Sequence, residues 1–189
     1  MTNIFFVRHA QPDERCSDDR TKPLTSQGLQ DREAVTTELL KYPIDIFFSS
    51  PYKRSVDTIA DCAQKLNMEI HTDERFRERQ RGESNEAFLY LQRRWDDFTF
   101  CEAGGESLGA VQARNIEALK EVLELHQHKN IIIGTHGTAL STILNYYDSS
   151  FGCEGFKSIW YCMPYILRCN FDNGALINRE LLLSIERGY

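Results

Sequence analysis

Residues 3–10 read Asn3-Ile4-Phe5-Phe6-Val7-Arg8-His9-Ala10, a short apolar run that ends in an arginine and a histidine. The same form occurs twice more. The apolar run at 131–135 leads to His136-Gly137, and the run at 44–48 leads through two serines to Arg54. Short apolar runs of this kind are typical of buried strands, and open α/β sheets bind ligands at the carboxyl ends of their strands. Two histidines and two arginines at three strand ends indicate an anion site with a possible nucleophile.

Helical patterns separate these strands. The sequence predicts a helix over 26–41, which begins at Thr25 or Ser26 and ends before Pro43. It predicts two more over 108–123, with Ser107 as the N-cap, and over 138–147. Between residues 52 and 66 the apolar side chains fall on one helical face. These are Tyr52, Val56, Ile59, Ala60, Ala63 and Leu66.

Three further segments read as strands. One is short, at 69–71, and two lie near the carboxyl end, at 165–171 and 175–178. Asp172-Asn173-Gly174 separates the last two and is a turn signal. We expect these two strands to pair as neighbours.

The alternation of strands and helices predicts an α/β fold, a three-layer α/β/α arrangement with a mostly parallel central sheet. Residues 1–189 are expected to form a single domain, because no linker divides them. Parallel order places His9 and His136 on one rim, where strand order reverses. The segment at about 78–106 is polar with several aromatics, and we expect it to form a small helical cap over that rim.

Composition excludes several classes of function. The net charge of −6 disfavours nucleic-acid binding, and no apolar stretch approaches the ~20 residues of a membrane span. The six cysteines show no metal-like grouping with histidine, so we expect neither a metal nor a cofactor. The chain starts with a strand pattern rather than a signal peptide, so the expected location is cytoplasmic.

Six motifs together resemble the histidine phosphatase superfamily, also called the phosphoglycerate-mutase-like family. They follow the family's order: Val7-Arg8-His9-Ala10, Pro23-Leu24-Thr25-Ser26-Gln27-Gly28, the block 49–58 from Ser49 to Thr58, Glu78-Arg79-Gln80-Arg81-Gly82, Gly104-Gly105-Glu106-Ser107-Leu108 and Thr135-His136-Gly137. One departure is Ala10, where the family commonly has glycine. Alanine would be strained there if the position needed a positive φ.

The resemblance implies a role for each residue of the anion site. His9 would attack phosphorus as a neutral imidazole and form a phosphohistidine, with its other ring nitrogen held by a backbone carbonyl. Arg8 and Arg54 would clamp the phosphoryl oxygens. The transferring oxygens would also bind His136 and the Gly137 amide.

Further residues are assigned by position. Glu78 is the candidate general acid, with Glu74, Glu83 and Glu86 as rivals. Arg15 falls in the loop after the first motif, where it would be either a third cation of the site or a mobile loop arginine. Ser50 and Thr135 would either orient the imidazoles or cap turns.

Four arginines alternate around Glu78. In an extended segment they would share one face, either as solvated surface or as a second anion-binding group. They are Arg75, Arg77, Arg79 and Arg81.

The function that these expectations favour is a metal-independent phosphomonoester hydrolase acting on a small phosphorylated metabolite. A mutase is the first alternative, although mutases of the family usually have a longer chain and a long insertion before the second histidine. A non-catalytic phospho-ligand-binding or interaction protein is the second. The natural substrate and the oligomeric state stay open at this point.

Overall fold

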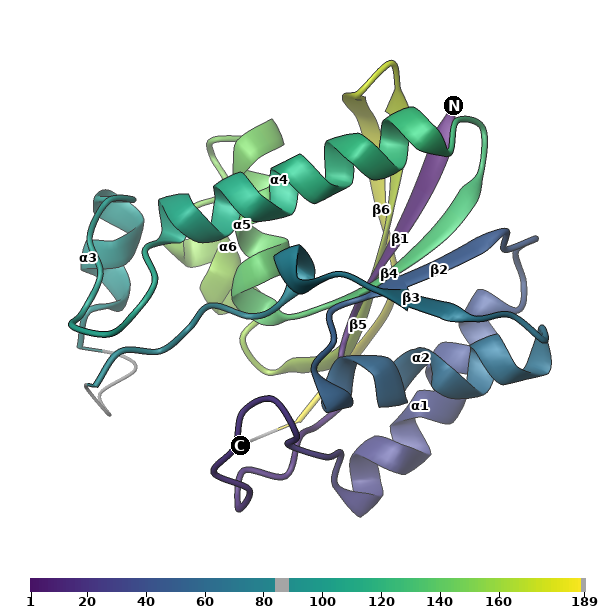
Figure 1. Cartoon of the computed structure of the whole chain (residues 1–189), viewed down its shortest axis with the longest axis horizontal. Helices are drawn as coiled ribbons and strands as arrows, with labels where there is room; N and C mark the ends of the chain where they lie inside the picture. The colour runs from purple at the N-terminus through teal and green to yellow at the C-terminus, as the bar shows by residue number, and fades with distance from the viewer. Residues whose placement is uncertain (84–88, 188–189) are drawn as a thin grey trace.

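The structure is a computed structural model, which describes residues 1–83 and 89–187 (Figure 1). Its centre is a six-stranded sheet in the order β3-β2-β4-β1-β5-β6. The strands β1 (Thr2–Arg8), β2 (Ile46–Ser49), β3 (Ile70–Thr72) and β4 (Asn130–Thr135) run parallel. The remaining two, β5 (Cys162–Asp172) and β6 (Ala175–Glu186), are antiparallel to their neighbours. The predicted mixed, mostly parallel α/β fold is confirmed.

Helices cover both faces of this sheet (Figure 1). One layer holds α1 (Ser26–Leu39) and α2 (Lys53–Lys65), and the other holds α4 (Leu108–Leu125) and α5 (Gly137–Tyr147). Shorter elements are the 3-10 helix η1 (Glu74–Phe76), α3 (Leu91–Asp96) and α6 (Cys153–Ser158). Of these short elements, α6 is not predicted from the sequence.

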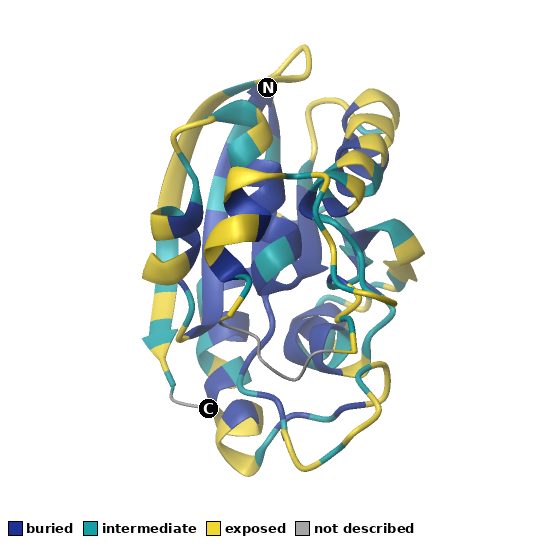
Figure 2. Ribbon diagram, turned by 90° about the vertical axis from the view of Figure 1, so that its left-hand side faces the viewer, coloured by how far each residue is buried: buried dark blue, intermediate teal, exposed yellow. Residues whose placement is uncertain are grey.

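The alternation of side chains along the strands divides the core into two halves. Ile4 and Phe6 of β1 pack in the cluster under α4 and α5, whereas Phe5 and Val7 pack against α1 and α2. Successive strand residues point to opposite faces, so a strand buried on both sides reads as a continuous apolar run. Figure 2 shows these central strands buried, with the edge strand β6 largely exposed.

The carboxyl-terminal hairpin follows its turn signal. Asn173 and Gly174 both have positive φ, 47° and 80°, as a tight two-residue hairpin turn requires. The strand predicted over 175–178 is nevertheless too short, because β6 continues to Glu186 as a mostly exposed edge with irregular pairing to β5. Bulged pairing breaks the simple alternation on which the shorter prediction depended.

One other expectation needs correction. The buried face of α2 is more polar than predicted: Ser55 and Thr58 are fully buried, while Tyr52 and Val56 are only half-buried. The segment 78–106 contains one short helix, α3, in its described part, and residues 84–88 lie outside the described residues. Trp95 of α3 packs against Phe156 of α6, which attaches this segment beside the start of α4 (Figure 1).

Gly28, in the first turn of α1, lies directly against the loop that follows β1. A Cβ there would come within 2.5 Å of the Gln11 carbonyl oxygen, which is backbone and cannot rotate away. Thr25 caps the helix by accepting from the Gly28 amide at 2.9 Å. Glycine is therefore required at this place to bring α1 against the loop beside His9.

We expect Gly28→Ala to destabilise the protein by about 1–3 kcal/mol, because overpacking outweighs the ~1 kcal/mol that alanine gains over glycine in a helix. Urea denaturation measures the change. Gly152→Ala is the matched control, since a Cβ at Gly152 meets no heavy atom within 4 Å. Equal stability of the Gly28 variant and the wild type would contradict the packing argument.

Candidate active site

The three predicted strand ends meet at one edge of the sheet. Pairing continues one residue beyond the strands: the His9 amide donates to the Thr135 carbonyl at 3.2 Å, and the Ser50 amide donates to the Gly134 carbonyl at 2.9 Å. Because β4 lies between β1 and β2, the residues that follow each strand converge around its end. The structure thus brings together Arg8, His9, Arg54, His136 and Gly137, as their positions in the sequence predict.

His9 has a defined tautomer. Its Nδ1 lies 2.7 Å from the Ala10 carbonyl oxygen, which can only accept, so Nδ1 carries the proton. The other nitrogen, Nε2, therefore has its lone pair free to accept, and Arg54 Nε donates to it at 3.3 Å. Burial, together with the charges of Arg54 and Arg8, holds the pKa of His9 well below its ordinary value. The imidazole is neutral and suited to nucleophilic attack.

Ala10 is not strained. Among the described residues, the non-glycine positions with positive φ are Asn67, His128 and Asn173. The concern raised by alanine at a usual glycine position is therefore unfounded. The Ala10 amide donates to the Thr58 hydroxyl at 2.9 Å, and that hydroxyl donates to the Arg54 carbonyl at 2.7 Å. This chain of bonds ties the His9 loop to the first turns of α2.

His136 is fully buried next to His9, with ring centroids 5.2 Å apart. Its Nε2 lies 2.8 Å from the Ser50 hydroxyl, and its Nδ1 has no hydrogen-bond partner among the residues that the structure describes. Burial and the charge of Arg54 hold its pKa well below the ordinary value. Of the two hydroxyls considered, Ser50 orients an imidazole, whereas the buried Thr135 hydroxyl makes no bond within the described part of the chain.

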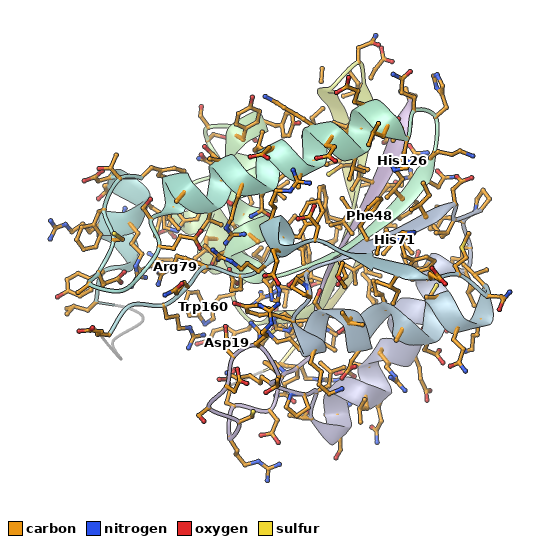
Figure 3. The ribbon with its side chains drawn as sticks, in the orientation of Figure 1. Asp19, Phe48, His71, Arg79, His126 and Trp160 are labelled. Carbon is orange, nitrogen blue, oxygen red and sulfur yellow. The ribbon has the colours of Figure 1, made fainter. Side chains whose placement is uncertain are left out.

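Arg8 crosses the first turn of α5. A Cβ at Gly137 would lie 3.1 Å from its Cζ and Nη2, so the guanidinium rests on glycine backbone. Nη1 donates to the Ile159 carbonyl, just before Trp160 (Figure 3). A larger residue at 137 would push this cation away, which explains the glycine after the second histidine.

Arg54 is held by a loop that sequence reasoning missed. Its Nη1 donates to the Asp19 carbonyl at 2.5 Å, and the Asp19 carboxylate lies 3.2 Å from the same nitrogen. Lys22 is buried and pairs with Glu14 at 2.7 Å and with Asp19 at 3.7 Å. The charge of Lys22 contributes to the low pKa of His9. The only signal for Asp19 and Lys22 in the sequence is their place between the first strand and the first helix.

Tyr52 borders the same cluster. Its ring packs edge-on against His136, with centroids 5.2 Å apart, and the Arg54 guanidinium lies 5.0 Å from its centroid. The side chain is half-buried, and burial raises the pKa of its hydroxyl. We predicted Tyr52 to be core of the α2 face, and the structure places it beside the candidate site.

Glu78 reaches this cluster from the segment after η1. Its carboxylate accepts from the Thr138 amide at 3.0 Å and from the Ala139 amide at 3.3 Å, both in the first turn of α5. It also accepts from the Arg79 amide at 2.7 Å. Glu78 and His136 are thereby fixed to the same helix terminus, where free amides attract a carboxylate. Of its rivals, Glu74 pairs with Arg20, Glu83 is exposed, and Glu86 lies outside the described residues.

Arg15 is not brought to the cluster. Its side chain is 90% exposed and binds Asp13 in a bidentate pair, with Nε at 2.8 Å and Nη2 at 2.6 Å. The contacts that the structure describes for Arg15 include none with Arg8, His9, Arg54 or His136. A loop position alone did not determine where this flexible side chain points.

The four alternating arginines do not share one face, because η1 interrupts the extended segment. Arg75 pairs with Asp73, Glu117 and Glu121, and Arg77 pairs with Glu106. Arg79 (labelled in Figure 3) is buried and pairs with Glu102, and Arg81 is exposed. At least three of the four are thus neutralised by carboxylates of this chain.

Other possible sites are sparse in the described part of the chain. No three His, Cys, Asp or Glu side chains of residues 1–83 and 89–187 gather as metal ligands. No helix within those residues has the length and apolarity needed to cross a membrane. His71 and His126 flank Phe48, away from Asp19 and Trp160 (Figure 3).

Comparisons with known proteins agree with this arrangement. The sequence profile of the "Histidine phosphatase superfamily (branch 1)" matches residues 4–160. Phosphoserine phosphatase 1 of Hydrogenobacter thermophilus is 27% identical over 150 residues, covering 72% of this chain and 71% of that protein. A 2,3-bisphosphoglycerate-dependent phosphoglycerate mutase of Gloeobacter violaceus is 27% identical over 184 residues, covering 87% and 84%.

A solved structure shows the same fold. It is phosphoserine phosphatase from Entamoeba histolytica in complex with 3-phosphoglyceric acid. The TM-score is 0.76 at 20% identity, with 99% of this chain and 98% of that chain covered.

The buried imidazoles should make the protein less stable as the pH falls below about 6.5. The pKa values of His9 and His136 lie well below 6.5 in the folded chain, whereas each histidine takes up a proton near that pH when unfolded. The unfolded state then binds more protons, so the free energy of unfolding decreases by up to about 1.4 kcal/mol per pH unit for each histidine. Urea denaturation between pH 7.5 and 5.5 measures this slope.

His136→Asn should reduce that slope, whatever its effect on stability at pH 7.5. Carboxylates act in a lower window: the pKa of Glu106, for example, is lowered to about 2 by its arginine partners against the cost of burial, so its contribution is lost only as the pH falls below ~4.5. An unchanged slope in the His136 variant would show that this imidazole is not held neutral.

Proposed function

The chain belongs to the histidine phosphatase superfamily, and we propose that it is a metal-independent phosphomonoesterase acting through a phosphohistidine at His9. Its substrate would be a small phosphorylated metabolite. The observation that carries the proposal is the state of His9: a neutral imidazole with Nδ1 fixed by a carbonyl and Nε2 facing the buried Arg54 guanidinium. An unprotonated imidazole nitrogen beside buried cations is the arrangement that attack on a phosphoryl dianion needs.

In the first step Nε2 of His9 would attack phosphorus and displace the ester oxygen. A P–N bond forms, the P–O bond to the leaving group breaks, and Glu78, carrying a proton, donates it to the departing oxygen. Arg8 and Arg54 would bind the phosphoryl oxygens, together with the Nδ1 side of His136 and the Gly137 amide. In the second step water attacks phosphorus, Glu78 takes its proton, and phosphate leaves with His9 restored.

The proposed mechanism uses residues that lie around His9 and His136. Arg15 is left out, because Asp13 engages it at the surface. Arg75, Arg77 and Arg79 are also left out, since they are neutralised within the chain, and Arg81 is left out because it is exposed.

A mutase is the second candidate, and the similarity to a phosphoglycerate mutase over most of the chain favours it. A mutase must keep its phosphoryl group from water, which calls for a closed site. The segment 78–106, which we expect to cover this rim of the sheet, contains one short helix, α3, in its described part. The two candidates separate in one assay: a mutase transfers label from phosphohistidine to an acceptor, and a phosphatase releases it as inorganic phosphate.

We expect a covalent phosphoenzyme to be trapped at His9. A labelled phosphomonoester quenched in alkali should leave the label on the wild-type chain, and acid should release it. His9→Ala should abolish both trapping and turnover, whereas His71→Ala, an exposed histidine away from the cluster, should change neither. A chelator should not alter the rate, because arginine supplies the positive charge. Full activity of the His9 variant would exclude this mechanism.

We expect Glu78→Gln to affect alkyl phosphates more than aryl phosphates. Without the acid, alkyl esters should hydrolyse roughly 10²–10⁴-fold more slowly, whereas aryl esters, whose leaving groups need less protonation, should lose much less. Steady-state kinetics with one ester of each type measures the ratio. Equal losses on both would show that Glu78 does not protonate the leaving group.

A further inference from the structure

The Gly104-Gly105-Glu106-Ser107 motif has no part in the chemistry proposed above. Its Glu106 carboxylate nevertheless contacts the segment that carries Glu78. Glu106 Oε2 accepts from Arg77 Nη1 at 2.8 Å, from Arg114 Nη2 at 2.9 Å and from the Gln80 amide at 3.2 Å. Glu106 Oε1 accepts from Arg114 Nε at 2.8 Å and from Arg77 Nη2 at 3.3 Å. Ser107 then caps α4, with its hydroxyl accepting from the Ala110 amide at 3.2 Å.

Arg114, about two turns into α4, uses all five of its N–H groups. Two bind Glu106, as given above, and the other three bind main-chain carbonyls. Nη1 donates to the carbonyls of Arg75 and Arg77, both at 2.7 Å, and Nη2 donates to the Glu78 carbonyl at 3.2 Å. The side chains of Arg114 and Glu106 are 14% and 13% exposed. No other side chain offers five donors in one rigid plane.

The segment that delivers Glu78 is otherwise irregular, because η1 ends at Phe76 and the chain is extended at Arg77. Such a segment does not fix its own geometry through repeated backbone bonds. The guanidinium replaces them: it joins the carbonyls of Arg75, Arg77 and Glu78 to a capped helix of eighteen residues. The Glu78 carboxylate then reaches the first turn of α5.

We propose that Arg114, held by Glu106, is the positioning residue that sets the Glu78 carboxyl for proton transfer. This inference rests on the proposed function and deepens it. Arg114 acts through the backbone of Glu78 and not on the substrate, so its loss should impair the step that needs the acid and leave phosphate binding largely unchanged. A displacement of about 1 Å at a reacting group lowers rates by up to roughly 10²-fold.

The test is a double-mutant cycle with two substrates. Arg114→Lys keeps the positive charge but loses the planar fork. It should lower kcat for an alkyl phosphate roughly 10- to 100-fold, affect an aryl phosphate several-fold less, and change KM little. In the Glu78→Gln background the same substitution should cost less than about twofold, because there is no acid left to position.

Arg75→Lys is the matched control. Arg75 lies in the same segment and is also ion-paired to α4, through Glu117 and Glu121, but its side chain has no described contact with Glu78. It should leave the alkyl-to-aryl rate ratio unchanged. If Arg114→Lys fails to fold, judged by its thermal transition, Glu106→Gln takes its place. That variant keeps the shape of the side chain, and the same ratio should fall.

The outcomes separate the two levels of the proposal. If Glu78→Gln discriminates between the esters and Arg114→Lys does not, or if the two losses multiply fully, Arg114 has only a structural role and the inference is wrong. If Glu78→Gln lowers the rate equally on both esters, Glu78 is not the general acid, and the positioning role of Arg114 is excluded as well.

Discussion

The parallel pairing of β1, β4 and β2 is the constraint on which the candidate site depends. The pairing continues past the strand ends, through the bonds from His9 to Thr135 and from Ser50 to Gly134. Hydrogen bonds of the sheet therefore place His9, His136 and the turn leading to Arg54. The backbone sets the positions of these residues. A shift of one residue in β4 would turn His136 to the opposite face and separate it from His9.

Burial gives this arrangement its chemistry. Arg8, Arg54 and Lys22 are buried cations in a chain whose net charge is −6, and burial together with their charges holds the pKa of His9 well below its ordinary value. Leaving such cations without any partner would be costly, so carbonyls and carboxylates of the chain engage them, among them the Ile159 carbonyl and Asp19. The same low polarity that raises this cost strengthens the attraction for an anion that enters.

The sequence was sufficient to predict the residues of the candidate site that follow strands, but not those that lie in loops. Arg8, His9 and His136 follow apolar runs, and the turn of β5 and β6 follows from Asn173-Gly174, because local sequence determines both. Asp19 and Lys22 lie in an irregular loop, where Asp19 pairs with both Lys22 and Arg54, and no local pattern indicates these contacts. Arg15 shows the opposite error: a plausible position in the sequence leads to an exposed pair with Asp13. The role of Arg114 depends on backbone carbonyls, which no residue type reveals.

Glu78 and His136 are both held at the N-terminus of α5. The carboxylate ends on the amides of Thr138 and Ala139, and the imidazole precedes them on the same helix. The separation of the Glu78 carboxylate from the imidazole is therefore set at one helix terminus. The Asp19 loop belongs to a different unit, because the Arg20 carbonyl accepts from the Lys53 amide at the start of α2 and the Asp19 carbonyl accepts from Arg54 on the same helix. The cluster is therefore divided between two helices: Glu78 and His136 are joined to the terminus of α5, and Arg54 with its loop is joined to α2.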